Sequence, residues 1–370
     1  MNDALSVTSL RTRKDAVATS RLDTVSMPLP LQAGEVVFRL DCFALTTNNL
    51  TYAAFGDSMH YWDLFPTGEA DWGQIPVWGF GDVVLSSAEG IAVGERFYGF
   101  FPIASHLKVR ATRVKPHGFS DGTEHRQLLA PVYNHYQRCS ANPAHQPGLE
   151  HPLLVVRPLF TTSFVCADFL ADQAFFGARQ VVISSASSKT AYGTAHCLGA
   201  HPGITRIALT SPRHQDFLRS LGCYDRVLGY DELASLPAAT PTLYLDFAGS
   251  PNVRAQVRQH FGPALVYDCV VGSANPSGEA TGVRWPDPRP TFFFAPTQIQ
   301  KRRTDWGAEG FEQRLQAAQT RFLRTISDPH QPWMQIRHGQ GFAAASEVIT
   351  ELQAGRTDPR TAHVVSLANA

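Results

Sequence analysis

A run of hydroxyl residues with one lysine is the first group of side chains that could bind a ligand. It reads Ser184-Ser-Ala-Ser-Ser-Lys-Thr-Ala-Tyr-Gly193 and follows the apolar stretch Gln180-Val-Val-Ile-Ser184. The side chains able to reach a phosphate are Ser185, Ser187, Ser188, Lys189 and Thr190. Where a strand opens into a helix, the first backbone N–H groups and the helix dipole favour an anion. The run therefore predicts phosphate contact by Ser188 or Lys189, unless Ser184 or Ser187 only caps the helix.

The same turn lacks the glycines that usually let a backbone approach the pyrophosphate of a dinucleotide. No Gly-x-Gly-x-x-Gly pattern occurs between Ser184 and Gly193. Taken alone, this absence counts against a cofactor. The hydroxyl groups and the lysine favour one, because the turn follows the strand at the sheet edge where ligands are expected.

The end of the next predicted strand bears on which dinucleotide would bind. An acidic residue there favours NAD, whereas a small polar residue followed by a base accepts the 2′-phosphate of NADP. The segment Ala208-Leu-Thr-Ser-Pro-Arg-His214 contains no acid, and the first one after it is Asp216. Ser211 and Arg213 therefore predict an NADP(H) pocket. The alternative is an ordinary Ser-Pro turn with a solvated arginine.

Cysteine and histidine spacing predicts no metal site. The six cysteines lie far apart without a Cys-x-x-Cys pair, and the 14 histidines are scattered. A structural zinc site needs clustered ligands, and a disulfide scaffold needs a short chain with closely spaced cysteines. We expect free cysteines that act as small core residues.

Composition limits the partners of the chain. Of 370 residues, 44% are hydrophobic and 17% charged, so a sizeable core can form. Lys and Arg total 32, as do Asp and Glu, and this balance argues against nucleic acid or an anionic membrane. We find neither an apolar run of eighteen residues nor a secretory signal at the N-terminus, and expect a soluble, cytoplasmic protein that binds a small-molecule substrate.

The pattern of elements predicts a two-domain α/β protein. Residues 1–152 contain alternating strands at 35–44, 76–85, 94–101 and 107–114, with Gly and Pro at the breaks, which indicates a barrel-like β domain. The polar stretch 115–152 is expected to form a long loop or lid.

Residues 153–295 alternate apolar strands with helices, which is typical of a doubly wound parallel sheet of the Rossmann type. A helix is expected over 167–176, and strands over 180–184, 204–209, 226–229, 242–246 and 265–267. Residues 296–370 are predicted to return to the first domain, with helices at 310–326 and 343–354 and a closing strand at 363–367.

The order of these parts resembles the zinc-free quinone-reductase and enoyl-reductase branch of the medium-chain dehydrogenase/reductase superfamily. Thr46-Thr-Asn-Asn-Leu-Thr-Tyr52 through Gly56 resembles its substrate-side segment, and Pro76-Val-Trp-Gly-Phe-Gly-Asp-Val-Val84 resembles its barrel core. Asp246-Phe-Ala-Gly249 resembles its Asp-x-x-Gly beside the cofactor. More narrowly, Ser-Ser-Ala-Ser-Ser-Lys-Thr-Ala and Phe-Phe-Phe-Ala-Pro-Thr-Gln-Ile-Gln-Lys-Arg resemble a divergent bacterial family known mainly as a domain of unknown function.

The resemblance implies a GroES-like β-barrel, a Rossmann-type domain and a possible homodimer. It implies catalytic roles for Tyr52, Asn48 and Asn49, with Tyr61 next. For the cofactor it implies Asp246, Gly249 and Gly272 in addition to the residues above. Gly79-Phe80-Gly81 stands where zinc-binding relatives have Gly-His-Glu, so no catalytic zinc is expected.

Two functions follow as hypotheses. The first is an NADPH-dependent reductase of an enone, quinone or enoyl thioester, in which the cofactor carries the hydride and the protein polarises the carbonyl. The second, prompted by the missing glycines, is a protein without redox activity that binds an acyl or nucleotide ligand, or a lyase or isomerase on the same scaffold.

Overall fold

The computed structural model describes residues 3–127, 129, 131–142, 145–146, 148–271, 290–355 and 357–367. The chain divides into two compact units. The barrel unit comprises residues 1–155 and 335–370, and the sheet unit comprises residues 156–334. The chain therefore leaves the barrel unit once and returns to it for its last 36 residues.

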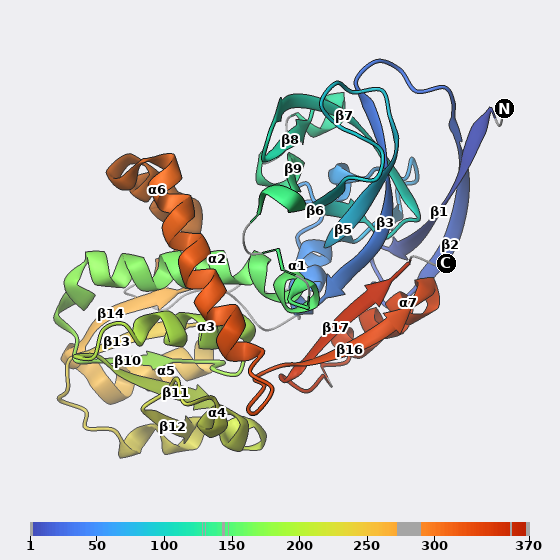
Figure 1. The fold of residues 1–370 in the computed structure, drawn as a ribbon. Helices are drawn as coiled ribbons and strands as arrows, with labels where there is room; N and C mark the ends of the chain where they lie inside the picture. The colour runs from blue at the N-terminus through green and yellow to red at the C-terminus, as the bar shows by residue number, and fades with distance from the viewer. Residues whose placement is uncertain are drawn as a thin grey trace. The chain divides into compact units, whose positions relative to one another are not determined.

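Six strands close the barrel of the first unit (Figure 1). In the order of their pairing they are β3 (Glu35–Leu45), β5 (Pro76–Ser86), β6 (Arg96–Pro102), β9 (His135–Arg138), β8 (Gly118–Asp121) and β7 (His106–Lys115). The ring closes because β7 also pairs with β3. Two strands from the end of the chain, β17 (Thr361–Ser366) and β16 (Gln335–Gln340), extend the sheet beyond β3. The GroES-like barrel expected from the sequence is confirmed.

Aromatic side chains fill this barrel. The ring of Phe38 lies 5.1 to 6.0 Å from four others, those of Phe97, Phe101, Phe119 and Tyr136. Helix α7 (Gly341–Gln353) adds Phe342, Ile349 and Leu352 to the same core. These side chains of α7 are thus part of the barrel core, and their burial stabilises the unit.

The stretch 115–152 is not the long loop that its polarity predicts. It contains strands β8 and β9, which complete the barrel, and the short 3-10 helices η2 (Glu124–Arg126), η3 (Pro131–Asn134) and η4 (Cys139–Ala141). Each strand has only four residues, so neither shows a recognisable alternation of its own. An N-terminal hairpin of β1 (Ala4–Arg13) and β2 (Ser20–Pro28), with β4 (Trp72–Gly73) beside β1, is a further feature that the sequence pattern did not predict.

The sheet unit is a parallel, doubly wound sheet. Its strand order is β12 (Arg226–Gly229), β11 (Thr205–Thr210), β10 (Gln180–Ile183), β13 (Thr242–Asp246), β14 (Leu265–Val270) and β15 (Thr291–Phe292). In chain order this is 3-2-1-4-5-6, the order of a Rossmann fold. The apolar runs form central strands because both faces of the sheet are covered. The Rossmann-type sheet expected from the sequence is confirmed.

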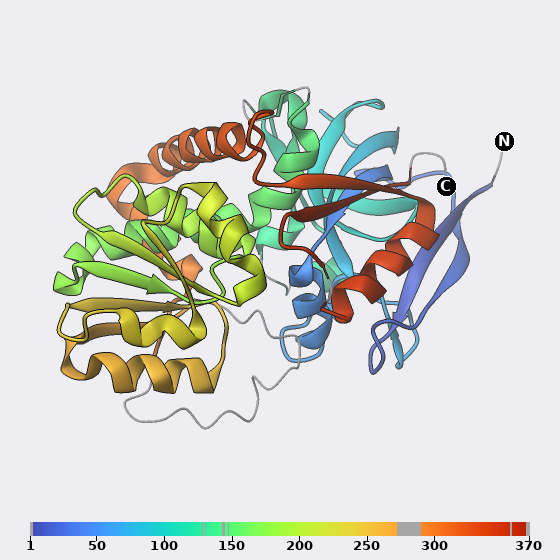
Figure 2. The ribbon, with the colours of Figure 1, turned by 90° about the horizontal axis from the view of Figure 1, so that it is seen from below.

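Helices cover both faces of this sheet (Figure 2). They are α2 (Glu150–Asp172), α3 (Lys189–Leu198), α4 (Gln215–Leu221), α5 (Pro251–Phe261) and α6 (Ala295–Ile326). Helix α2 begins well before the predicted start at residue 167, and α6 begins before residue 310 and bends at Gly307, where φ is +75°. Helix α2 is the one described helix long and apolar enough to cross a membrane, and 56% of its apolar window is buried inside the structure.

Candidate functional site

Tyr52 and Asn48 lie together on helix α1 (Thr47–Ala54) of the barrel unit. They are one helical turn apart, so their side chains project from the same face. The Asn48 amide donates to the Tyr52 hydroxyl at 2.7 Å, and the Trp78 indole N–H on β5 donates to the same oxygen at 3.2 Å. The structure therefore places two of the three predicted catalytic residues in direct contact.

Asn49, the third, takes part in the fold of α1. Its Oδ1 accepts from the Thr46 backbone N–H at 2.8 Å, which closes a capping box at the helix start. Its Nδ2 donates to the carbonyl of Pro76 at 3.0 Å, and the side chain is only 4% exposed. Asn49 thus ties α1 to β5, the strand that carries Trp78.

The Tyr52 ring lies in a cluster of aromatic side chains. Tyr61, Phe100 and Tyr133 lie 4.8, 5.3 and 6.3 Å from it, and the hydroxyls of Tyr61 and Tyr133 are hydrogen-bonded at 2.9 Å. Burial raises the pKa of Tyr52, and the hydrogen bonds from Trp78 and Asn48 act in the opposite direction. The phenol is therefore neutral near pH 7 and carries a proton that it can donate.

A buried arginine holds the loop that supplies Tyr133. Arg126 is 2% exposed and pairs with Asp121 at 3.2 Å. It also donates to the Asn134 side chain at 3.0 Å and to the backbone carbonyl of Tyr133. A buried ion pair needs such additional partners to offset its desolvation. The loop of η3 is thus fixed against the barrel through Arg126.

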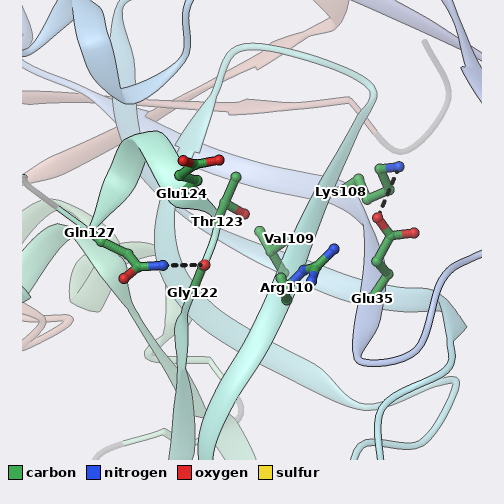
Figure 3. A pocket seen from close by; sticks show the side chains of 8 residues that line it. All are labelled: Glu35, Lys108, Val109, Arg110, Gly122, Thr123, Glu124 and Gln127. Carbon is green, nitrogen blue, oxygen red and sulfur yellow. Dashed lines mark hydrogen bonds and ion pairs between the residues drawn. The ribbon is translucent and has the colours of Figure 1, made fainter.

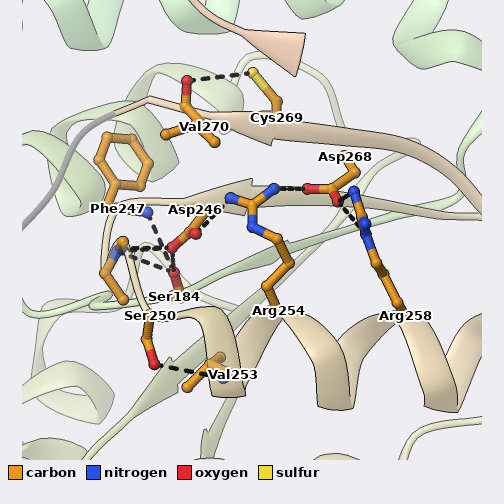
Figure 4. Close-up of polar contacts among 12 residues, drawn as sticks. Ser184, Asp246, Phe247, Ser250, Val253, Arg254, Arg258, Asp268, Cys269 and Val270 are labelled. Atoms are coloured by element: carbon orange, nitrogen blue, oxygen red, sulfur yellow. Dashed lines mark hydrogen bonds and ion pairs between the residues drawn. The ribbon is translucent and has the colours of Figure 1, made fainter. Parts of the chain in front are cut away.

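In the sheet unit, the carboxyl ends of β10 and β13 are linked by polar contacts (Figure 4). Ser184 donates to Asp246 at 2.8 Å, and the same carboxylate oxygen accepts from the backbone N–H of Ala248 at 2.9 Å and of Gly249 at 3.0 Å. The other Asp246 oxygen pairs with Arg254 on α5. The hydrogen bonds of Asp246 thus fix the turn 246–249 beside residues 184–188, which connect β10 to α3 and form the first loop of the sheet unit.

The first loop keeps a tight turn without the usual glycine. Ser185 has φ +46°, in the left-handed region that favours glycine, and its N–H donates to the Tyr230 hydroxyl at 3.0 Å. Ser188 caps α3 by accepting from the N–H of Ala191 at 3.4 Å, and Lys189 and Thr190 form the first turn of the helix. The capping role proposed as an alternative for Ser184 or Ser187 belongs instead to Ser188.

A histidine connects this loop to the end of β11. Nδ1 of His214 lies 3.1 Å from the Ser187 hydroxyl and 3.3 Å from the Ser211 hydroxyl. Arg213, in the short 3-10 helix η6 (Pro212–His214), has an exposed side chain. The structure thus brings the two predicted phosphate-binding segments together at the carboxyl edge of the sheet. Gly272 lies outside the described residues.

Among the residues of these clusters that the sequence analysis did not predict are Trp78, His214 and Arg254. His214 is the last residue of the segment 208–214 that predicts the NADP pocket, and Trp78 lies in the segment that resembles the barrel core. In neither case do the adjacent residues in the sequence indicate which side chain it contacts. Arg254 lies on the amphipathic helix α5, and nothing in the sequence indicates that its side chain is buried. Contacts between residues 26 and 27 positions apart, as in Tyr52–Trp78 and Ser187–His214, have no local signal.

Two cavities lie elsewhere. One of about 500 Å³ is in the barrel unit, where Lys108 pairs with Glu35 at 3.1 Å (Figure 3). Burial acts to raise the pKa of Glu35, but the Gln32 N–H and Lys108 lower it overall. The other, of about 340 Å³, lies among α2, α3 and α6 and includes His196 and Arg321. Neither cavity is lined by a predicted site residue, and the described residues hold no group of three or more His, Cys, Asp or Glu side chains that could bind a metal.

Comparisons with known proteins place the fold. A quinone oxidoreductase from Coxiella burnetii is 14% identical, with 98% of this chain and 100% of that chain covered and a TM-score of 0.53. CurA from Vibrio vulnificus in complex with NADPH is 13% identical, with 98% and 100% covered and a TM-score of 0.59. An Etr1p variant in complex with NADP and crotonyl-CoA is 10% identical, with 98% and 100% covered and a TM-score of 0.57.

The structural similarity shows a shared fold, in agreement with the resemblance to the medium-chain reductases. At identities this low it shows nothing beyond the fold. No curated protein matches the chain. One family model, described as "Protein of unknown function (DUF2855)", matches residues 43–358. The matched segment spans most of the barrel unit and the whole sheet unit. The chain therefore belongs to the DUF2855 family.

Proposed function

We propose that this chain is an NADPH-dependent reductase of an enone, a quinone or an enoyl thioester, and that it works without zinc. The observation that carries the proposal is the edge of the parallel sheet where Ser187 and Ser211 meet at His214. No acidic residue follows β11 before Asp216, so the edge offers no carboxylate to the 2′-position of a ribose. The NADPH and NADP complexes among the proteins of the same fold support this choice of cofactor.

The residues at this edge fit a dinucleotide phosphate. Ser185 provides the left-handed turn that glycine usually provides, and α3 begins directly behind it. We propose that Ser188, Lys189 and Thr190 hold the pyrophosphate. Ser211 and the exposed Arg213 would hold the 2′-phosphate. NADPH supplies the hydride when it is bound.

The barrel unit would polarise the substrate. Tyr52 is neutral and its hydroxyl can donate a hydrogen bond to a carbonyl oxygen as negative charge develops there. Asn48 holds the Tyr52 hydroxyl in place at 2.7 Å. A fixed hydroxyl donor can replace a Lewis acid in this role, which is why we propose that zinc is not required. Turnover should then persist after exhaustive treatment with a chelator.

A second function is favoured by the contacts within the first loop. Ser184, Ser187 and the N–H of Ser185 already bond to Asp246, His214 and Tyr230. A loop satisfied by its own protein gains less from a phosphate, because each contact must be exchanged for another. The alternative is a protein without redox activity that binds an acyl or nucleotide ligand, or a lyase or isomerase.

Titration with NADPH and NADH separates the two functions. The purified chain would be titrated with each nucleotide, and reduced-nicotinamide fluorescence and thermal stability would be followed. We expect NADPH to bind more tightly than NADH. Arg213→Ala should weaken NADPH roughly 10- to 100-fold and leave NADH nearly unchanged, because a charge-assisted contact to the 2′-phosphate is lost.

Arg219→Ala is the matched control for this titration. Arg219 is also an exposed arginine, but it pairs with Asp216 at 2.8 Å on α4. Its removal should leave the affinity for both nucleotides unchanged. Equal weakening of NADPH and NADH by Arg213→Ala would reject the 2′-phosphate pocket. If neither nucleotide binds and an acyl thioester stabilises the protein, the second function is correct.

We also propose that two copies of the chain form a homodimer through strand β15. In the described part of the chain this strand pairs on one side only, with β14. Phe292 in this strand and the nearby Phe294 are 66% and 57% exposed, which is unusual for side chains of this size. Light scattering should give a dimer for the native chain and a monomer for Phe292→Lys. Val93→Lys, which changes an equally exposed residue of the barrel unit, should remain dimeric.

A further inference from the structure

The Tyr52 hydroxyl is bonded to two donors. A phenol oxygen has two lone pairs that accept hydrogen bonds and one proton that it donates. An indole N–H can only donate, so the contact at 3.2 Å from Trp78 occupies one lone pair. The Asn48 Nδ2 contact at 2.7 Å occupies the other. Among the described residues the Tyr52 hydroxyl has these two donors and no acceptor, so its own proton has no partner among them.

Two connections between α1 and β5 fix this geometry. Asn49 and Tyr52 are three residues apart on the helix, and Pro76 and Trp78 are two residues apart on the strand, so each pair shares one face. The Asn49 amide bonds to the Pro76 carbonyl at 3.0 Å, next to the Trp78–Tyr52 bond. The distance between the indole and the phenol is therefore set by a second, buried bond.

The Trp78 ring is itself held by its neighbours. It stacks on Tyr98 with ring centroids 5.3 Å apart and an interplanar angle of 10°. Phe100 lies 4.8 Å away on the same strand β6, and Tyr133 lies 6.2 Å away. An indole packed on three rings of a barrel wall has little freedom to turn its N–H elsewhere.

We infer that Trp78 is a positioning residue that makes the Tyr52 hydroxyl donate to its ligand, so that the site selects a carbonyl oxygen over an alcohol. A ketone, enone, quinone or thioester presents an acceptor to this proton. An alcohol can also accept, but its own O–H finds no lone pair left on Tyr52. The inference rests on the proposed function for its catalytic consequence and on the geometry of the barrel unit alone for the role of Trp78.

The same arrangement strengthens the donor. A hydroxyl that accepts two hydrogen bonds is polarised by them and donates more strongly. In line with this, the bonds from Trp78 and Asn48 lower the pKa of Tyr52 against the larger, opposite effect of burial. The hydroxyl can therefore stabilise charge on a carbonyl oxygen without giving up its proton.

The first test is spectroscopic and requires no activity. The chain has six tryptophans, so the indole N–H region of a ¹H–¹⁵N spectrum is simple, and Trp78→Phe identifies the Trp78 signal. Tyr52→Phe should move that signal upfield and speed its exchange with solvent, because the indole loses its acceptor. Tyr61→Phe, which removes a neighbouring hydroxyl bonded to Tyr133, should leave it in place. An unchanged Trp78 signal in Tyr52→Phe overturns the inference.

The second test uses a carbonyl substrate that the native enzyme reduces. Trp78→Phe should lower kcat about tenfold and leave the Kd for NADPH unchanged, and Trp78→His, which restores an N–H, should recover part of the loss. Trp72→Phe on β4 is the control and should keep the native rate. Turnover that Trp78→His fails to recover would assign Trp78 to packing and contradict its positioning role.

The selectivity is tested with the alcohol that corresponds to this substrate. It should bind the native protein more weakly than the carbonyl compound does, and the difference should shrink in Trp78→Phe. Equal affinities in the native protein would overturn the selectivity. If the native protein binds no NADPH and reduces nothing, the proposed function fails, and the indole spectrum alone decides the role of Trp78.

Discussion

Ser185 occupies a position at which most dinucleotide-binding folds have glycine. Its φ of +46° brings Cβ close to the backbone carbonyl, at a cost of roughly 1–2 kcal/mol for an L-residue. The conformation is held by the bond from its N–H to Tyr230 at 3.0 Å. The absence of the glycine motif therefore reflects a change of residue type rather than the loss of the turn.

This strain leads to a prediction about stability. Ser185→Gly should have a larger free energy of unfolding than Ser185→Ala, by about 1 kcal/mol, although glycine normally destabilises through its flexible unfolded state. The order should reverse at Ser187, which does not have a positive φ. Urea denaturation of the four variants at pH 7 measures the difference. An alanine variant at 185 as stable as the glycine variant would rule out the strain.

At the scale of elements, α5 is joined to the sheet by buried charges. Arg254 has no exposed side-chain surface and pairs with Asp246, which is also fully buried, and with Asp268 on β14. Asp246 in turn fixes the loop after β13 through Ser184 and two N–H groups. Ionised groups are costly to bury. Arg254 and the two carboxylates therefore offset one another's loss of hydration.

Removal of Arg254 should therefore be severe. Arg254→Met leaves Asp246 as an uncompensated buried charge, and we expect the free energy of unfolding to fall by about 3–5 kcal/mol. Arg258→Met is the matched control on the next turn, because Asp268 keeps Arg254 as a partner when Arg258 is lost. The control should lose markedly less stability in urea denaturation. Similar losses in both variants would contradict the central role of Arg254.

The sequence predicted those elements that carry their own pattern. Strands β10 and β13 are continuous apolar runs, which identified them as buried parallel strands within one residue of their observed ends. Strands β8 and β9 are short and mixed in polarity, and only their pairing with β7, with β6 and with each other makes them strands. Helix α2 contains Pro158 and a polar first turn, which concealed its start.

The candidate site, like the fold, could be predicted from the sequence only in part. Asn48 and Tyr52 are one turn apart on a helix, so their contact could be expected once the helix was known. Trp78 and His214 reach their partners across the fold, and no spacing in the sequence reveals such a pair. Asn49 illustrates the opposite case, because residue type alone does not distinguish an amide that caps a helix from one that meets a substrate.

At the scale of the whole molecule, the barrel unit is built from both ends of the chain. Strand β17 pairs with β3, and Phe342, Ile349 and Leu352 of α7 lie in the barrel core. The barrel core therefore combines side chains from segments that lie far apart in the sequence. Equilibrium unfolding of the native chain consequently includes the exposure of the buried side chains of α7.

His196 on α3 should dominate the fall in stability at mildly acidic pH. Burial, with smaller effects of Arg321 and Arg206, lowers its pKa from 6.5 to about 4 in the folded chain. The unfolded chain therefore binds a proton below pH 6.5 that the folded chain does not. Stability should be complete above pH 6.5 and should decline towards pH 4 by at most about 1.4 kcal/mol per pH unit from this group. His196→Phe should flatten the urea-unfolding profile between pH 6.5 and 4, whereas His330→Gln, which removes an exposed imidazole, should not. A profile as steep in His196→Phe as in the native chain would mean that other groups take up the proton.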